Sequence, residues 1–220
     1  MGQIWLPKKL SKLMDETNTQ FIGIKGASGA GKTTATKIMR AHFSDSIVLQ
    51  GNHYLSKAIL SDPELCESVF GKVFKNQNAL WDYYYKNENP ELLRKLVINA
   101  NQHIADMYVE DIGNLLSQNY IPNPIIGEYA YLNTMPEVWE RIATHRVGIN
   151  TPITKVAENL GSRDGVDTSR LRYEACSDLY DVGTPGIEIT NNGTLQEFKQ
   201  KIESLCGTIG AESNTLLTNA

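Results

Sequence analysis

The chain has 220 residues, of which 41% are hydrophobic and 21% charged, and its formal net charge at pH 7 is −4. This length favours one domain around a single core, and the acidic balance argues against a stable nucleic-acid partner attracted by bulk charge. Three widely spaced cysteines argue against a disulfide framework or a zinc site, and no apolar run is long enough to span a membrane, so we expect a cytoplasmic protein without a membrane partner.

The first half of the chain predicts two strands among helices. Apolar residues at helical spacing predict a short helix over residues 7–17, and the compact apolar run at 21–24 predicts a strand. A helical pattern resumes at Thr33. Residues 46–51 predict a second buried strand, and a largely helical block follows from 62 to 118.

The second half predicts three more strands. Ile125 and Ile126 follow a proline-rich turn and lead into Glu128, which suits a central strand. A helix around 136–143 and a short strand at 145–149 come next. The final strand at 187–190 leads through an Asn-Asn-Gly turn into a helix, at which Thr194 and Glu197 form a capping box.

This alternation of strands and helices predicts a three-layer α/β fold with a parallel sheet of about five strands. Ligands of such sheets bind at the carboxyl ends of the strands. The polar stretch between residues 151 and 185 reads as helices joined by a mobile loop, and we interpret it as a lid. The tail from Gly207 has no periodicity and is expected to fray.

A phosphate-binding loop lies between the first strand and the following helix. The segment fits G-x-x-x-x-G-K-[ST], with Gly26, Ala27, Ser28, Gly29, Ala30, Gly31, Lys32 and Thr33, and we add Thr34 to the expected nucleotide contacts. Glycines let successive N–H groups point inward, the lysine ammonium reaches the β and γ phosphates, and the Thr33 hydroxyl is suited to Mg²⁺. ATP and Mg²⁺ are therefore the expected cofactors.

The rest of the chain favours a small kinase as the user of this nucleotide. An Asn-Lys-x-Asp guanine-binding motif is absent, which argues against a GTPase, and a motor or transporter ATPase would be longer. A small kinase needs a small-molecule phosphoryl acceptor, a lid that excludes water, and cations that neutralise the transferred group.

Three segments together carry a family resemblance. GASGAGKTT at 26–34, RDGV at 163–166 and ITNNGTLQEFKQKI at 189–202 resemble dephospho-CoA kinases and the related bacteriophage deoxynucleoside monophosphate kinases. The resemblance implies that Arg163 contacts the ATP phosphates and that Asn191, Asn192 and Gly193 lie by the adenine. A solvated arginine and an ordinary Asn-Gly turn are the alternative interpretations of these residues.

The sequence departs from dephospho-CoA kinases after the second strand. Those enzymes carry an Asp-x-Asp there, and the last Asp is suited to deprotonate the ribose 3′-hydroxyl; this chain has Gln50, Gly51 and Asn52. An amide cannot act as a base at neutral pH, which removes about 10² to 10⁴ in rate for a hydroxyl acceptor. A phosphate acceptor needs no base, so a (deoxy)nucleoside monophosphate is the first choice and dephospho-CoA the second.

The sequence also departs from the phage enzymes, which tend to carry an Asp followed by an Arg after the third strand. This chain has Glu128, Tyr129 and Ala130, so the arginine is missing. Glu128 is a candidate to organise the Mg²⁺ waters, and a salt-bridged structural acid is the alternative. Both departures leave open a nucleotide-binding module without catalysis, although the intact Lys32 and Thr33 argue against it.

Two further residues are candidates for the acceptor side. His53 follows Asn52 and is placed to touch an acceptor phosphate, although an isolated histidine is more often a packed or surface residue. Arg94 is suited to clamp a phosphate as a bidentate donor, or it pairs with Glu91 on the same helix.

These assignments divide a single domain of residues 1–220 into functional parts. The core comprises 20–52, 121–150 and 186–206, the acceptor-binding region is helical over 53–120, the lid covers 151–182, and the frayed tail is 207–220. The sequence does not indicate the oligomeric state.

Overall fold

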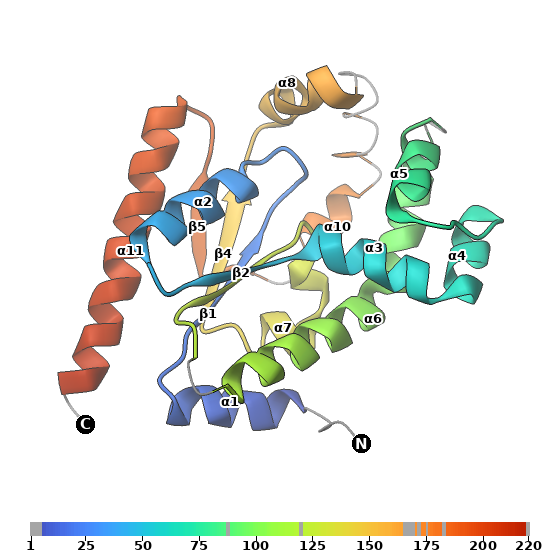
Figure 1. Cartoon of the computed structure of the whole chain (residues 1–220). Helices are drawn as coiled ribbons and strands as arrows, with labels where there is room; N and C mark the ends of the chain where they lie inside the picture. Colours follow the sequence, from blue (N-terminus) through green and yellow to red (C-terminus); the bar gives the residue numbers. More distant parts are fainter. Residues whose placement is uncertain are drawn as a thin grey trace.

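Five parallel strands form the centre of the fold in the computed structural model, which describes residues 6–86, 89–118, 121–164, 170, 173–174, 176–181 and 184–218. The strands lie in the order β2-β3-β1-β4-β5. Their bounds are β1 Phe21–Lys25, β2 Ile47–Gln50, β3 Ile125–Glu128, β4 His145–Asn150 and β5 Ile187–Thr190. The predicted parallel α/β sheet is therefore confirmed, and all five carboxyl ends lie along one edge, which is the upper edge in Figure 1.

Side chains alternate between the two faces of the sheet because successive strand residues point in opposite directions. Ile22 and Ile24 of β1 belong to the apolar core under α2 (Lys32–His42) and α11 (Leu195–Thr218). Phe21 belongs to the larger core on the other face. Figure 1 shows α2 and α11 together on one side of the sheet.

The opposite face is covered by helices from distant parts of the sequence. They are α1 (Pro7–Glu16), α6 (Pro90–Leu116), the short 3₁₀ helix η1 (Leu132–Thr134) and α7 (Pro136–Trp139). Trp139 is completely buried there, and Gly23 of β1 leaves room for its ring.

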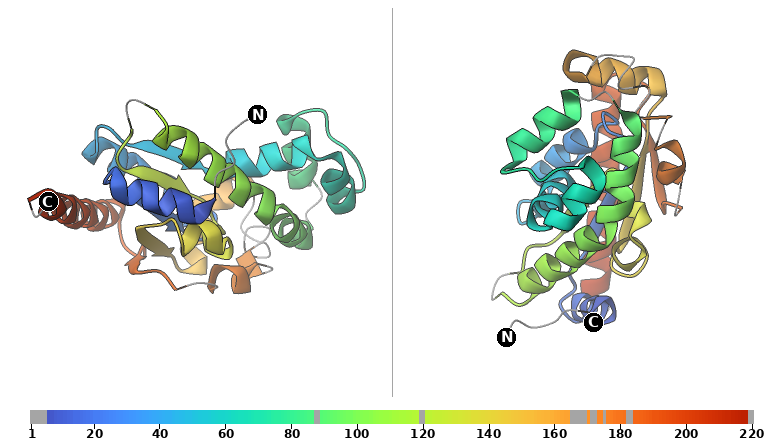
Figure 2. Two further views of the ribbon diagram at one scale, coloured as in Figure 1. Left: turned by 90° about the horizontal axis from the view of Figure 1, so that it is seen from below. Right: turned by 90° about the vertical axis from the view of Figure 1, so that its right-hand side faces the viewer.

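The predicted acceptor region forms a helical group beside the sheet (Figure 2). It contains α3 (Gly51–Ser61), α4 (Pro63–Phe70) and α5 (Gln77–Lys86), and both α3 and α4 pack against α6. Strand β2 ends at Gln50, one residue before its predicted end, and helix α3 begins at Gly51. The predicted lid contains α8 (Ile153–Asp164), at the carboxyl edge of the sheet, and α10 (Ser177–Asp181).

The prediction of a frayed tail from Gly207 was wrong for residues 207–218, because α11 continues to Thr218. Cys206 and Ile209 are fully buried and extend the apolar stripe that Ile202 and Leu205 begin one turn earlier. The predicted capping box at the start of this helix is confirmed, since the Glu197 carboxylate accepts the backbone N–H of Thr194 and the Thr194 hydroxyl accepts that of Glu197. No described helix is both long and apolar enough to cross a membrane.

Candidate active site

The segment 26–33 curls back on itself between β1 and α2. Gly26, Gly29 and Gly31 adopt positive φ angles of 148°, 81° and 104°. Gly31 is the N-cap of α2, so the first-turn N–H groups of this helix, which have no intrahelical acceptor, open onto the loop. The backbone is therefore shaped as an anion cradle rather than an extended connection.

The Lys32 ammonium lies across this cradle. Its Nζ donates to the carbonyl oxygens of Gly26 at 2.9 Å and Ala27 at 3.0 Å, and the side chain is half-buried. Both of these acceptors are neutral carbonyls of the loop itself. A phosphate oxygen would compete well for the same donor, because hydrogen bonds between ionised partners are roughly twice as strong.

Glu128 faces α2 because of its position in β3. Ile126 lies in the core beneath α2, and Glu128 is two residues further along the same face. Its Oε1 accepts from the Thr33 hydroxyl at 3.0 Å, and its Oε2 accepts from the Thr36 hydroxyl at 3.0 Å. The carboxylate thus lies beside the hydroxyl that the sequence assigns to Mg²⁺.

This pair of oxygen donors fits a magnesium ion. Mg²⁺ prefers hard oxygen ligands and usually keeps water and substrate phosphates in its shell, so a hydroxyl and one nearby carboxylate suffice. Among the described residues, no group of three or more His, Cys, Asp or Glu side chains forms an alternative metal site. Thr33 and Glu128 would hold the metal here.

One cavity of about 600 Å³ brings most of the predicted site together. It contains residues of the phosphate-binding loop, the end of β3 with Glu128, and Asn52 at the start of α3. Its remaining walls come from α8 and from the segment that starts α11. The residues that line it are Ser28, Gly29, Gly31, Lys32, Thr33, Thr34, Asn52, Glu128, Tyr129, Ala130, Lys155, Asn159, Leu160, Asn191, Leu195 and Phe198.

Two buried side chains fix the back of the phosphate-binding loop. The carbonyl oxygen of Ala30 accepts from Asn191 Nδ2 at 2.9 Å and from the Thr151 hydroxyl at 3.0 Å. Asn191 thus braces the loop, and this contact comes from the turn in which the resemblance places adenine contacts. Asn192 is exposed, and the carbonyl of Gly193 accepts from Lys155.

Sequence reasoning missed several residues of the site. Lys155 and Asn159 lie one turn apart on α8 and line the cavity, and Asn159 Nδ2 donates to the carbonyl of Gly29 at 2.8 Å. Thr36 was also missed, although its spacing of three residues from Thr33 on a helix places both hydroxyls on one face. The sequence does contain a signal for these residues. Polar residues at i, i+3 (Thr33 and Thr36) or i, i+4 (Lys155 and Asn159) share one face of a helix.

The other predicted residues lie outside the cavity or outside the described side chains. His53 is exposed and packs edge-on to Tyr54, with ring centroids 6.0 Å apart. Arg163 belongs to α8, and its side chain lies outside the described part of the chain. The assignments of these two residues stay predictions.

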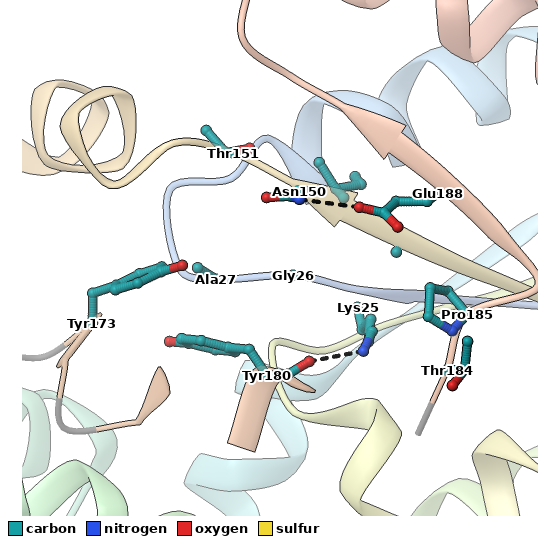
Figure 3. A pocket seen from close by; sticks show the side chains of 12 residues that line it. Lys25, Gly26, Ala27, Asn150, Thr151, Tyr173, Tyr180, Thr184, Pro185 and Glu188 are labelled. Atoms are coloured by element: carbon teal, nitrogen blue, oxygen red, sulfur yellow. Dashed lines mark hydrogen bonds between the residues drawn. The ribbon is translucent and has the colours of Figure 1, made fainter. Parts of the chain in front are cut away.

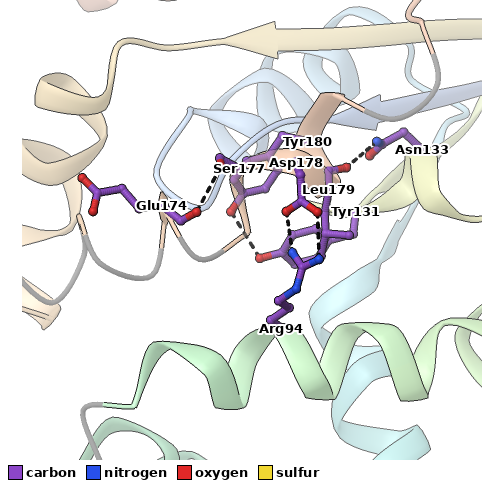
Figure 4. A network of polar contacts seen from close by, with 8 residues as sticks. All are labelled: Arg94, Tyr131, Asn133, Glu174, Ser177, Asp178, Leu179 and Tyr180. Carbon is purple, nitrogen blue, oxygen red and sulfur yellow. Dashed lines mark hydrogen bonds and ion pairs between the residues drawn. The ribbon is translucent and has the colours of Figure 1, made fainter.

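Arg94 forms a bidentate ion pair with Asp178 of α10 (Figure 4). The second of its two hydrogen bonds, from Nη2 to Oδ2, measures 2.8 Å. Arg94 therefore pairs with a residue of the predicted lid, whereas the sequence offered an acceptor phosphate or Glu91 as its partner. Hydrogen bonding to the guanidinium holds the pKa of the Asp178 carboxyl below its ordinary value.

Tyr180 connects the same helix α10 to the phosphate-binding loop. Its ring stacks on Tyr131 with centroids 5.2 Å apart, and the two hydroxyls lie 3.2 Å from each other. Burial raises the pKa of Tyr180, while the Tyr131 hydroxyl and the backbone amide of Ser28 oppose that rise. The buried Lys25 ammonium donates to the carbonyl of Tyr180 at 2.8 Å, within a second cavity of about 280 Å³ (Figure 3).

Comparisons with known proteins agree with this arrangement at the level of fold. No family model matches the chain, and no curated protein matches it. Among solved structures, TT1252 from Thermus thermophilus is 17% identical with a TM-score of 0.55, and the match covers 86% of this chain and 97% of that one. The dephospho-CoA kinase from Campylobacter jejuni is 14% identical with a TM-score of 0.54, covering 87% of this chain and 97% of that one. The five-stranded parallel sheet with its flanking helices is therefore a fold that the chain shares with these two proteins, one of which is a dephospho-CoA kinase.

Proposed function

We propose that the chain is an ATP-dependent kinase that transfers the γ-phosphoryl group to a small acceptor, a (deoxy)nucleoside monophosphate in the first instance. The observation that carries this proposal is the single cavity shared by the curled loop, the Lys32 ammonium and the Thr33–Glu128 pair. A loop that only sensed adenine would not need an ammonium and a metal-binding hydroxyl beside the phosphates.

Several residues of the cavity have a defined part in the proposed transfer. The loop amides hold the phosphate chain, and Lys32 leaves the carbonyls of Gly26 and Ala27 to neutralise charge on the β and γ oxygens. Thr33 and Glu128 would hold Mg²⁺, which when bound would shield the negative charge of the phosphates. Helix α8 lies against the loop through Asn159 and excludes water from the reaction.

The choice of acceptor rests on which groups can take a proton. Asn52 lines the cavity but its amide is not a base at neutral pH. Of the described residues that line the cavity, Glu128 alone carries a carboxylate; both of its oxygens accept threonine hydroxyls, and its side chain is 7% exposed. This arrangement favours an acceptor that is already ionised, as a phosphate is.

Arg94 is the proposed contact for the acceptor's own phosphate. Its guanidinium already holds the Asp178 carboxylate in the two-pronged geometry with which arginine binds phosphate. In this proposal the acceptor phosphate exchanges with that carboxylate, and Arg163 of α8 adds positive charge at the ATP phosphates.

Dephospho-CoA is the second candidate acceptor. The segments at 26–34, 163–166 and 189–202 resemble dephospho-CoA kinases as well as the phage enzymes, and the Campylobacter protein that shares the fold is a dephospho-CoA kinase. Phosphorylation of the 3′-hydroxyl of dephospho-CoA would require a base, which Asn52 does not provide. Dephospho-CoA therefore ranks below a nucleoside monophosphate.

Coupled ADP release from a panel of nucleoside monophosphates and dephospho-CoA tests the proposal. We expect turnover with at least one monophosphate and none after Lys32→Ala. Turnover with dephospho-CoA alone would reverse the order of the candidates. Binding of ATP without turnover of any acceptor would instead identify a nucleotide-binding module without catalysis.

A further inference from the structure

The Glu128 carboxylate is held by two hydroxyls of one helix. Thr33 and Thr36 lie one turn apart on α2, and each donates to a different oxygen of the carboxylate at 3.0 Å. Thr36 is 3% exposed and Glu128 is 7% exposed, so water has little access to either. A buried carboxylate oxygen without a donor is costly, so each of the two bonds contributes to the position of this group.

The main chain of Glu128 is fixed independently of its side chain. Its carbonyl oxygen lies 3.2 Å from the hydroxyl of the fully buried Tyr108, and the next residue donates its N–H to the carbonyl of Ile24 at 3.1 Å. The backbone at the end of β3 is therefore clamped from α6 and from β1. The freedom that remains to Glu128 is rotation of its side chain.

The hydrogen bonds that Thr33 and Thr36 donate to Glu128 should respond differently when a nucleotide binds. In the proposed function the Thr33 oxygen coordinates Mg²⁺, and its hydroxyl then no longer has the same geometry toward Glu128 Oε1. Thr36 is buried behind Thr33, so its bond to Oε2 can persist. We propose that Thr36 is a positioning residue that keeps the Glu128 carboxylate aimed at the metal position while Thr33 turns to the metal.

A purely structural explanation for Thr36 is also visible. Its hydroxyl lies 3.1 Å from the carbonyl of Thr33, a contact of the kind that threonines make within helices. One hydroxyl proton cannot serve both acceptors fully, and the ionised carboxylate at 3.0 Å is the stronger acceptor. The experiment must therefore separate an effect on the metal from an effect on the helix.

The inference rests on the proposed function, and binding of ADP tests it without turnover. We would measure the dissociation constant of ADP by calorimetry with Mg²⁺ and with EDTA, in the wild type and in Thr36→Val. Loss of an outer-shell partner typically weakens metal binding by 10- to 100-fold, so we expect at least a tenfold weaker affinity in Mg²⁺. In EDTA the variant should stay within about twofold of the wild type, because the phosphate cradle is intact.

Three further variants make the result specific. Thr36→Ser keeps a hydroxyl and should restore the wild-type values. Thr17→Val is a control far from the site. The Thr17 hydroxyl, at the C-cap of α1, makes a similar bond to the carbonyl of Leu13, four residues earlier, at 2.8 Å, and its loss should leave both dissociation constants unchanged. In a Glu128→Gln background, Thr36→Val should add less than about twofold, because the two residues act as a unit.

The outcomes distinguish this inference from the proposed function. If Mg²⁺ tightens ADP binding equally in the wild type and in a folded Thr36→Val variant, the proposed role of Thr36 is wrong, and the proposed function still stands. An equal loss in Mg²⁺ and in EDTA would assign Thr36 to the helix and overturn it too. A wild type that does not bind ADP would remove the proposed function. If the valine variant does not fold, Thr36→Ala carries the same expectations.

Discussion

Replacing Gly31 by alanine tests whether the cradle depends on a left-handed glycine at the start of α2. The residue has φ +104° and is the N-cap of the helix. An added Cβ would lie 2.9 Å from Asn191 Nδ2 and 3.2 Å from the ring of Phe198. The methyl group would therefore displace the amide that supports the Ala30 carbonyl.

Two contributions set the size of the expected effect. Holding a non-glycine residue at positive φ costs about 1–2 kcal/mol. Breaking the buried hydrogen bond between Asn191 and Ala30 costs about 1–3 kcal/mol more. We expect a loss of roughly 2–5 kcal/mol in the free energy of unfolding, which lowers the Tm of a protein of this size by roughly 4–20 °C.

Thermal unfolding followed by circular dichroism measures this loss directly. Gly207→Ala is a matched control in the middle of α11, where an added Cβ meets nothing within 4 Å. The free energy of unfolding of that variant should rise by up to about 1 kcal/mol, because alanine has a higher helix propensity than glycine. A Gly31→Ala variant with the Tm of the wild type, or a shift no larger than that of the control, would refute the reasoning.

Other predictions concern the surroundings of the site. Gly51→Ala would place a methyl 2.2 Å from the ring of Tyr129. The free energy of unfolding should fall by about 1–3 kcal/mol, measured as a lower unfolding midpoint in denaturant. An unchanged midpoint would contradict this packing. Tyr108→Phe removes a buried hydroxyl that lies 3.2 Å from carbonyls at the ends of β2 and β3, and should cost about 1–3 kcal/mol in the same measurement. Asp178→Asn should destabilise the protein near pH 7. Since Arg94 lowers the folded pKa of Asp178 below its ordinary value of 3.8, the difference in Tm should vanish as the pH falls through that lower value, and a difference that persists there would contradict the ion pair's role.

The sequence was sufficient to predict the sheet and the loop. Short apolar runs between turn residues located all five strands, and the motif at 26–33 predicted a curled loop between a strand and a helix. These features depend on local patterns, which one sequence contains. The structure adds that Glu128 lies on the α2 face of the sheet, because it follows Ile126 by two residues in β3.

Contacts between distant segments could not be predicted in the same way. Arg94 and Asp178 are 84 residues apart, and no local pattern indicates that α10 lies against α6. The bond from Asn191 to the Ala30 carbonyl spans 161 residues. The prediction of a frayed tail was wrong for a different reason. Gly207 and the polar residues around it obscured the apolar stripe of α11, which Ile209 continues.

The central claim is that the curled loop and Lys32 hold the phosphates of a nucleotide. Calorimetric titration of Mg²⁺·ATP into the wild type and into Lys32→Met tests it most directly. The variant keeps the length of the side chain and loses the charge, and removing a charge-assisted bond costs about 1.5–3 kcal/mol, or roughly 10- to 150-fold in affinity. We predict saturable binding by the wild type and a loss of that size in the variant; equal affinity of the two proteins, or no binding by the wild type, would contradict the account.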